Sequence, residues 1–187
     1  LLGICLLEGR RYDLAHPLFT RLTKERKHVW AQVGLGVACY YQGQHEQAVG
    51  ILQQVVDQQH ISVEAFSWLA RNLWMRGEMT EAVTLMRKAV MLQPTVPQLH
   101  SELGNLAAWS EDWNLAADAF RNALAFGRHS VFQHPDYYFA LVRCLLDKHR
   151  KQPGDTEVLE LEAMRVMEDV SRDFMEAQVV RFRAHLM

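Results

Sequence analysis

Two short stretches of the sequence contain residue types that bind metals or catalyse reactions in other proteins. His45-Glu46 begins like the helical zinc-protease motif, in which two histidines four residues apart bind zinc and the glutamate acts as the base. The position of the second histidine is occupied by Val49. One histidine alone does not hold a catalytic zinc ion, so we expect no metal site here.

The second stretch is GRHSVFQHPD, residues 127–136, which contains the close histidine pair His129 and His134. A metal ion there would need two further ligands from elsewhere. Ser130 lies next to His129, but a nucleophile and its base need an arrangement in space that adjacency in sequence rarely gives. Arg128 and the histidines are better explained as cations near helix ends, where each contributes about 0.3–1 kcal/mol. We therefore expect a connection between helices, with no catalytic residue, metal or cofactor.

The bulk properties of the chain exclude several classes of partner. The formal net charge of -2 gives no basic surface for binding nucleic acid. No apolar run reaches the 18 or so residues that span a bilayer, so we expect no membrane segment. The three cysteines are far apart and lie in apolar helical patterns, which indicates buried thiols and a reducing, cytoplasmic setting. The chain opens partway along a helical pattern, so we expect a fragment of a longer protein.

The elements that would position any functional residue repeat with a period of 34 residues, in segments that begin at residues 29, 63 and 97. A leucine followed by a small residue recurs in each segment: Leu35-Gly36, Leu69-Ala70 and Leu103-Gly104. An alanine recurs further along: Ala48, Ala82 and Ala116. Gly43 and Gly77 mark a turn between two helices, and Glu111 takes the corresponding place in the third segment. Small residues at these places let two helices approach closely, and glycine suits a tight turn.

This pattern resembles the tetratricopeptide repeat. The resemblance implies an all-α fold, a right-handed superhelical solenoid of helix-turn-helix units in which each unit covers the apolar face of its neighbour. We expect one array over residues 1–187. Its expected parts are a partial repeat (1–28), three clear repeats (29–62, 63–96 and 97–130), a divergent repeat (131–174) with Phe139-Ala140 as its large-small pair, and a terminal helix (175–187).

The resemblance implies that the first helix of each unit lines the concave surface of the solenoid. The inward-facing residues of these helices then form one stripe along that surface. The expected partner-binding groove consists of Val37, Tyr40, Tyr41, Arg71, Trp74, Met75, Asn105 and Trp109. Aromatic residues and arginine dominate binding hot spots, so this composition suits a protein or peptide. The alternative is that Tyr40 and Trp74 pack between adjacent helices. Val33, Val37 and Ser67 stand where some relatives carry a clamp for a terminal carboxylate, so the sequence does not support that clamp.

The expected function is a non-catalytic protein–protein interaction module. Residues 121–143 are similar to the tetratricopeptide region of bacterial response regulators with a CheY-like receiver, which suggests the output region of a two-component signal transduction system. One alternative is an assembly factor for a secretion or pilus system, and another is a scaffold attached to an enzyme domain outside this chain. The acidic segment 155–176, with eight Asp/Glu against two Arg, is a rival binding surface. The sequence leaves self-association into a homo-oligomer open.

Overall fold

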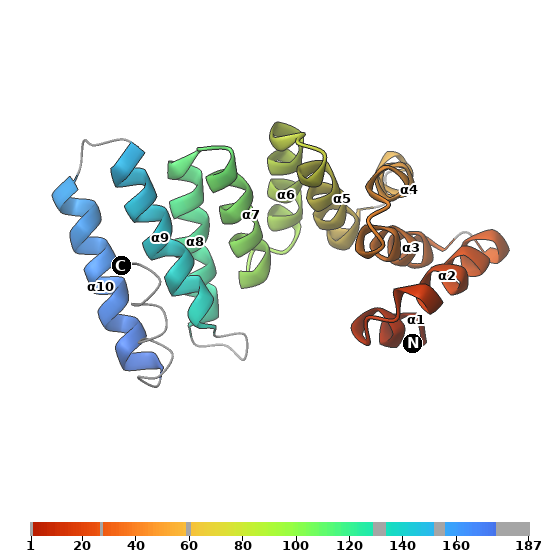
Figure 1. Cartoon of the computed structure of the whole chain (residues 1–187), viewed down its shortest axis with the longest axis horizontal. Helices are drawn as coiled ribbons and strands as arrows, with labels where there is room; N and C mark the ends of the chain where they lie inside the picture. The colour runs from red at the N-terminus through yellow and green to blue at the C-terminus, as the bar shows by residue number, and fades with distance from the viewer. Residues whose placement is uncertain (1, 27, 59–60, 129–133, 152–155, 175–187) are drawn as a thin grey trace. The chain divides into compact units, whose positions relative to one another are not determined.

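A computed structural model of the 187-residue chain describes residues 2–26, 28–58, 61–128, 134–151 and 156–174. Within these ranges the chain forms ten α-helices and no strand, which confirms the expected all-α class (Figure 1). The helices are α1 (Leu2–Glu8), α2 (Tyr12–Arg26), α3 (Val29–Tyr41), α4 (His45–Asp57), α5 (Val63–Met75), α6 (Met79–Leu92), α7 (Pro97–Trp109), α8 (Trp113–Gly127), α9 (Pro135–Lys151) and α10 (Thr156–Asp173).

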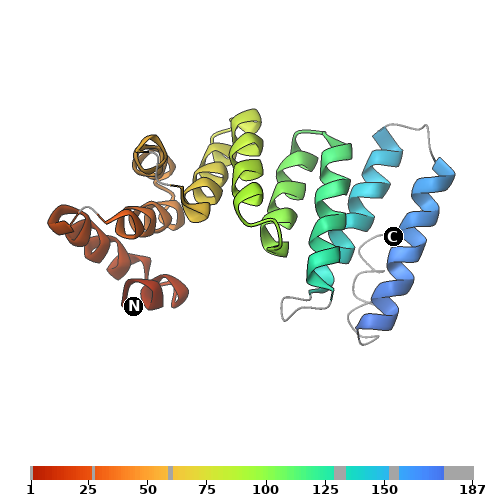
Figure 2. The ribbon, with the colours of Figure 1, turned by 180° about the vertical axis from the view of Figure 1, so that it is seen from behind.

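The chain divides into two compact units, residues 1–93 and residues 94–187, called unit 1 and unit 2 below. Unit 1 contains α1 to α6, and unit 2 contains α7 to α10. Within each unit, helices that follow one another in sequence pack together. In unit 2, α7 and α9 both contact α8 and also contact each other (Figures 1 and 2).

Three-residue turns join the helices of the regular pairs, at residues 42–44, 76–78 and 110–112, where the period predicts them. Gly43 and Gly77 adopt left-handed backbone conformations with φ of 75° and 86°, and Glu111 adopts the same conformation with φ of 58°. In each turn an amide beyond the helix end returns to a carbonyl inside it, for example Gln44 N to Cys39 O at 2.9 Å. These bonds satisfy carbonyls that the end of the first helix would leave without a partner.

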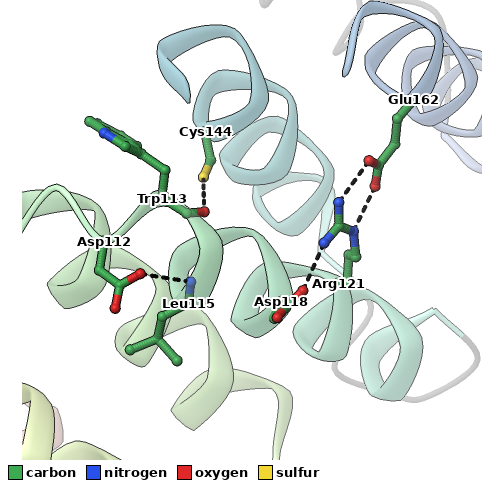
Figure 3. Close-up of polar contacts among 7 residues, drawn as sticks. All are labelled: Asp112, Trp113, Leu115, Asp118, Arg121, Cys144 and Glu162. Atoms are coloured by element: carbon green, nitrogen blue, oxygen red, sulfur yellow. Dashed lines mark hydrogen bonds and ion pairs between the residues drawn. The ribbon is translucent and has the colours of Figure 1, made fainter. Parts of the chain in front are cut away.

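Side chains and prolines at the helix starts explain where several helices begin. The Ser62 hydroxyl accepts a hydrogen bond from the Ala65 amide, and the Asp112 carboxylate accepts one from the Leu115 amide (Figure 3). Both bonds satisfy amides that the first turn of a helix leaves unpaired. Pro97 and Pro135 are the first residues of α7 and α9, where a missing amide hydrogen costs nothing.

Small residues set the distance between paired helices, as the repeat pattern predicts. Ala48, Ala82 and Ala116 are fully buried. A β-carbon added to Gly104 of α7 would lie 2.6 Å from the Phe120 ring of α8, and one added to Gly36 of α3 would lie 2.7 Å from Leu52 of α4. The partner side chain thus occupies the space that a larger residue would need.

The pair α9–α10 departs from the sequence expectation in its register. Phe139 and Ala140 are only half-buried, so their assignment as the large-small pair is wrong. Leu141 and Val142 take that role with exposed fractions of 1% and 2%. The longer connection before α9 places Leu141 38 residues after Leu103, whereas Phe139 as the first residue of the pair assumes a spacing of 36. On α10 the buried residues are Leu159, Ala163, Val166 and Val170.

Some sequence expectations fall on parts of the chain that the structure does not describe. His129, Ser130 and most of the connection before α9 belong to residues 129–133, which lie outside the described ranges. The same holds for the terminal helix expected at 175–187.

Arginine–carboxylate contacts hold α10 in unit 2. The Arg121 guanidinium of α8 donates from Nε and Nη2 to the two carboxylate oxygens of Glu162, each at 2.7 Å (Figure 3). Arg128 lies directly after the end of α8, and its guanidinium also reaches α10, where its Nε lies 3.0 Å from Asp173. The Tyr138 hydroxyl also donates to Asp173 at 2.6 Å. This bond, aided by Arg128, holds the pKa of Asp173 below its usual value.

The close approach of α7 and α8 predicts the effect of adding a methyl group. Gly104→Ala should destabilise the protein by about 1–3 kcal/mol, because the new β-carbon overlaps the buried Phe120 ring. The matched control is Gly50→Ala in α4, where no atom lies within 4 Å of the added carbon. That change should stabilise by about 0.5–1 kcal/mol through helix propensity. Urea denaturation measures both, and equal effects of the two substitutions would contradict the packing.

The bidentate geometry at Arg121 predicts a cost for a conservative change. Arg121→Lys should lower the free energy of unfolding by about 1 kcal/mol, because an ammonium cannot donate to both oxygens of Glu162 at once. Arg21→Lys is the control, since Arg21 lies 3.7 Å from Glu25 in a pair whose side chains are both more than half exposed. We expect little change there. An unchanged melting temperature for Arg121→Lys would show that this pair does not hold α10.

Candidate partner-binding surface

In unit 1, the residues of the expected groove differ in how much surface they offer. Val37 of α3 is buried, Tyr40 is half-buried and Tyr41 has an exposed fraction of 48%. On α5, Arg71 and Trp74 are half-buried, and Met75 has an exposed fraction of 50%. Tyr41 and Met75 are therefore the members of this set that offer the most surface in unit 1.

An aromatic cluster connects α2, α3 and α5 in unit 1. The rings of Tyr12 and Tyr41 stack with centroids 4.4 Å apart, and Tyr40 and Tyr41 contact the Trp68 ring at 5.3 and 5.6 Å. The Arg71 guanidinium lies over the same indole, 4.2 Å from its centroid. Such ring and cation–π contacts each contribute about 0.5–1.5 kcal/mol. Tyr40 therefore packs between neighbouring helices, as the alternative interpretation of the stripe describes.

Sequence reasoning missed Trp68, although it stands directly before the repeated Leu69. The groove expected from the sequence contains Arg71, Trp74 and Met75 of α5 and leaves Trp68 out. The signal in the sequence was a large aromatic residue directly beside a buried leucine position. A neighbouring helix must pack against such a side chain.

In unit 2, two adjoining hollows lie between α7 and α9. The first has a cavity volume of about 390 Å³, and the second has one of about 420 Å³. Both are lined by Asn105 of α7 and by Ala140 and Arg143 of α9. The first continues to Trp109 and Lys151, and the second continues to Ser101, Asp136 and Phe139. We call the two together the α7–α9 groove.

The α7 side of this groove contains two residues of the expected set together with Ser101 and Ala108, and the α9 side contains none of that set. Asn105 and Trp109 line it, and Trp109 has an exposed fraction of 66%. Phe139, Arg143 and Asp147 were missed, because the register assigned to α9 was wrong by two residues. The buried sequence pattern was the available signal: Tyr137, Tyr138, Leu141, Val142, Cys144 and Leu145 repeat the spacing of Leu99, His100, Leu103, Gly104, Leu106 and Ala107.

Ion pairs hold part of the groove wall in place. Lys151 Nζ lies 3.2 Å from Glu111, and Arg150 lies 3.8 Å from Asp147. These pairs join charged side chains at the Trp109 end of the groove. They are largely exposed, so each contributes less than about 1 kcal/mol.

The one thiol on the groove wall lacks the environment of a nucleophile. Cys144 is buried, and its sulfur lies 3.9 Å from the Trp113 carbonyl oxygen (Figure 3). Burial raises the pKa of the Cys144 thiol to about 11. Reactive cysteines have lowered pKa values in electropositive, accessible surroundings, so Cys144 behaves as a small apolar side chain.

Two searches of the described part of the chain concern other kinds of site. Among these residues, no group of three or more His, Cys, Asp or Glu side chains is arranged to hold a metal ion. No helix among them is long and apolar enough to cross a membrane.

Paired helices with small contact residues and short glycine turns define a solenoid of helix-turn-helix repeats. Residues 1–59 and 33–97 match the model of one family, the tetratricopeptide repeat. These matches cover half of the chain, so the chain belongs to the tetratricopeptide repeat family. This family assignment supports a protein–protein interaction module.

Solved structures share this fold at low sequence identity. One is MamA from Desulfovibrio magneticus RS-1, from residue 41 to the end, with a TM-score of 0.72, 16% identity, and coverage of 92% of this chain and 94% of that chain. Another is TTC0263, a thermophilic tetratricopeptide repeat protein of Thermus thermophilus, with a TM-score of 0.70, 19% identity, and coverage of 99% of this chain and 95% of that chain. No curated protein matches the sequence. These likenesses establish the fold alone.

The environment of Cys144 predicts its reactivity. Cys5 is exposed, so the expectation of three buried thiols is wrong at that position. At about pH 8.5, where an ordinary thiol is half ionised, iodoacetamide should modify Cys5 and leave Cys144 intact. The pKa of Cys144 is higher in the folded state than in the unfolded state. The free energy of unfolding should therefore be at its full value below about pH 9 and should decrease as the pH rises towards 11. Peptide mapping by mass spectrometry reads out both thiols, with denatured protein as the control in which each reacts. Equal labelling of Cys5 and Cys144 in the folded protein would contradict the assignment.

Proposed function

We propose that the chain is a non-catalytic module that binds a segment of a partner protein in the α7–α9 groove. The observation that carries this proposal is the exposed Trp109 indole beside a hollow of about 390 Å³. Ala108 and Ala140, which are small, also line this hollow and leave room for a side chain of the partner. Tryptophan in such a place supplies a large apolar contact area at a low cost in side-chain entropy.

Unit 1 contributes a second contact surface in this proposal. It consists of Tyr41 and Met75, both about half exposed, together with the accessible edges of Tyr40, Arg71 and Trp74. Val37 is buried and offers no surface to a partner. The stacking of Tyr41 on Tyr12 holds its ring in place, so that little flexibility is lost when a partner binds.

The biological setting is a separate part of the proposal. The similarity of residues 121–143 to the tetratricopeptide region of bacterial response regulators favours the output region of such a protein as the setting. Five of these residues, 129–133, lie outside the described ranges. The reading frame upstream of Leu1 distinguishes the settings. A receiver domain with clustered aspartates and a late lysine supports signal transduction, whereas a lipobox supports secretion or pilus assembly. A catalytic signature there supports a scaffold for an enzyme.

The groove is tested with peptides selected from a random library displayed on phage, using the whole chain as the target. For a selected peptide, Trp109→Ala should weaken binding about thirtyfold, which is the effect of losing a hot-spot residue worth about 2 kcal/mol. Fluorescence polarisation measures the affinity, and the melting temperature reports on the fold.

Trp30→Ala is the matched control, because Trp30 is also more than half exposed but lies on α3 outside the predicted stripe. It should leave peptide binding unchanged. The proposal is wrong if Trp109→Ala binds like the parent while Met164→Glu, on the exposed face of α10, removes binding. That result would place the partner on the acidic C-terminal surface.

A further inference from the structure

The chemistry of the α7–α9 groove restricts what kind of segment can occupy it. This inference rests on the proposed function and extends it to the partner's side chains. The two hollows share Asn105, Ala140 and Arg143, so the groove continues on both sides of the Arg143 side chain. A partner segment that lies in the groove therefore extends past Arg143 on both sides.

Arg143 is the basic group of the groove that has no carboxylate bound to it. The other two cations, Arg150 and Lys151, lie close to Asp147 and Glu111, respectively. Among the residues that the structure describes, Arg143 forms no ion pair, and it is exposed. Its guanidinium carries donors suited to both oxygens of a carboxylate. Asn105 lines the same place and offers an amide donor and acceptor.

The two ends of the groove differ in character. At one end the indole of Trp109 lies near the small residues Ala108 and Ala140. At the other end is Asp136, in the first turn of α9 and seven residues before Arg143. Asp136 is 3.2 Å from the exposed His134 ring. An acidic residue of a partner would be repelled by Asp136 at this end of the groove. The groove therefore accepts such a residue only beside Arg143.

Helix geometry sets the spacing of the partner's side chains. Asn105 and Trp109 are four residues apart on α7, which is about 6 Å along the helix axis. Two residues of an extended peptide span about 6.6 Å. A carboxylate at Arg143 and Asn105 and an apolar side chain on Trp109 therefore belong to residues two positions apart.

We infer that the α7–α9 groove recognises an internal acidic residue of an extended partner segment, Asp or Glu, with a large apolar residue two positions away. The continuity of the groove on both sides of Arg143 favours an internal side chain over a terminal carboxylate. A nucleic acid phosphate is disfavoured, because Asp136, Asp147 and Glu111 line the same groove and the chain carries a net charge of -2.

The test selects peptides from the phage library in parallel on the parent chain and on Arg143→Glu. Parent-selected peptides that depend on Trp109 should carry Asp or Glu two positions from Trp, Phe, Leu or Met. Replacing that acid by lysine in the synthetic peptide should weaken binding to the parent about tenfold or more. The same lysine peptide should bind Arg143→Glu more tightly than the acidic peptide does, because the charges are exchanged.

Arg87→Glu is the matched control, since Arg87 is exposed on α6 and the substitution changes the net charge equally. It should change the affinity of neither peptide by more than about twofold at physiological salt, because Arg87 lines neither hollow. Melting temperatures of both variants show whether the fold is kept.

Two negative outcomes are distinguishable. Peptides that need Trp109 but show no preference for an acid, and bind Arg143→Glu as they bind the parent, overturn this inference and leave the proposed function intact. If no selected peptide depends on Trp109, the proposed function fails and this inference fails with it. Binding that requires a free peptide C-terminus, and is lost on amidation, would also overturn the assignment of an internal residue.

Discussion

The distance between the two helices of a pair is the constraint on which the rest of the structure depends. In α7–α8 this distance is set by the missing side chain of Gly104, against which the Phe120 ring packs. In α3–α4, Gly36 and Leu52 make the corresponding contact. Packed interiors tolerate little change in volume, so these contacts determine how each pair presents its first helix. The α7–α9 groove exists because α8 holds both of its walls at a fixed spacing.

Much of this architecture could be predicted from the sequence, because the period of 34 residues records its contacts directly. The buried alanines, the turn positions and the buried face of α10 follow from residue size and spacing. The register of α9 did not follow, because a connection of unusual length interrupts the period before Pro135. Periodicity fixes position only as long as each unit has the same length. The buried residues of α9 repeat those of α7 with a spacing of 38.

The candidate site was predictable on one wall only, for the same reason. Asn105 and Trp109 belong to a regular unit and line the groove, whereas Arg143 belongs to the shifted one. Aromatic composition was a weaker guide in unit 1, where Tyr40 and Trp68 contact each other between helices. Sequence alone does not separate an aromatic residue that packs from one that binds, because both are placed on the same stripe of a helix.

The turn before α8 differs from the other two in a way that affects the groove. Glu111 takes up a left-handed backbone conformation that glycine adopts at Gly43 and Gly77, at a cost of about 1–2 kcal/mol for a residue with a side chain. Its carboxylate lines the groove and lies beside Lys151. Glycine would relieve the strain, but it would also remove a negative charge from the rim and leave Lys151 without this partner. Thermodynamic stability and the charge of the groove rim are thus coupled at a single residue, and a substitution to glycine improves the first only by changing the second.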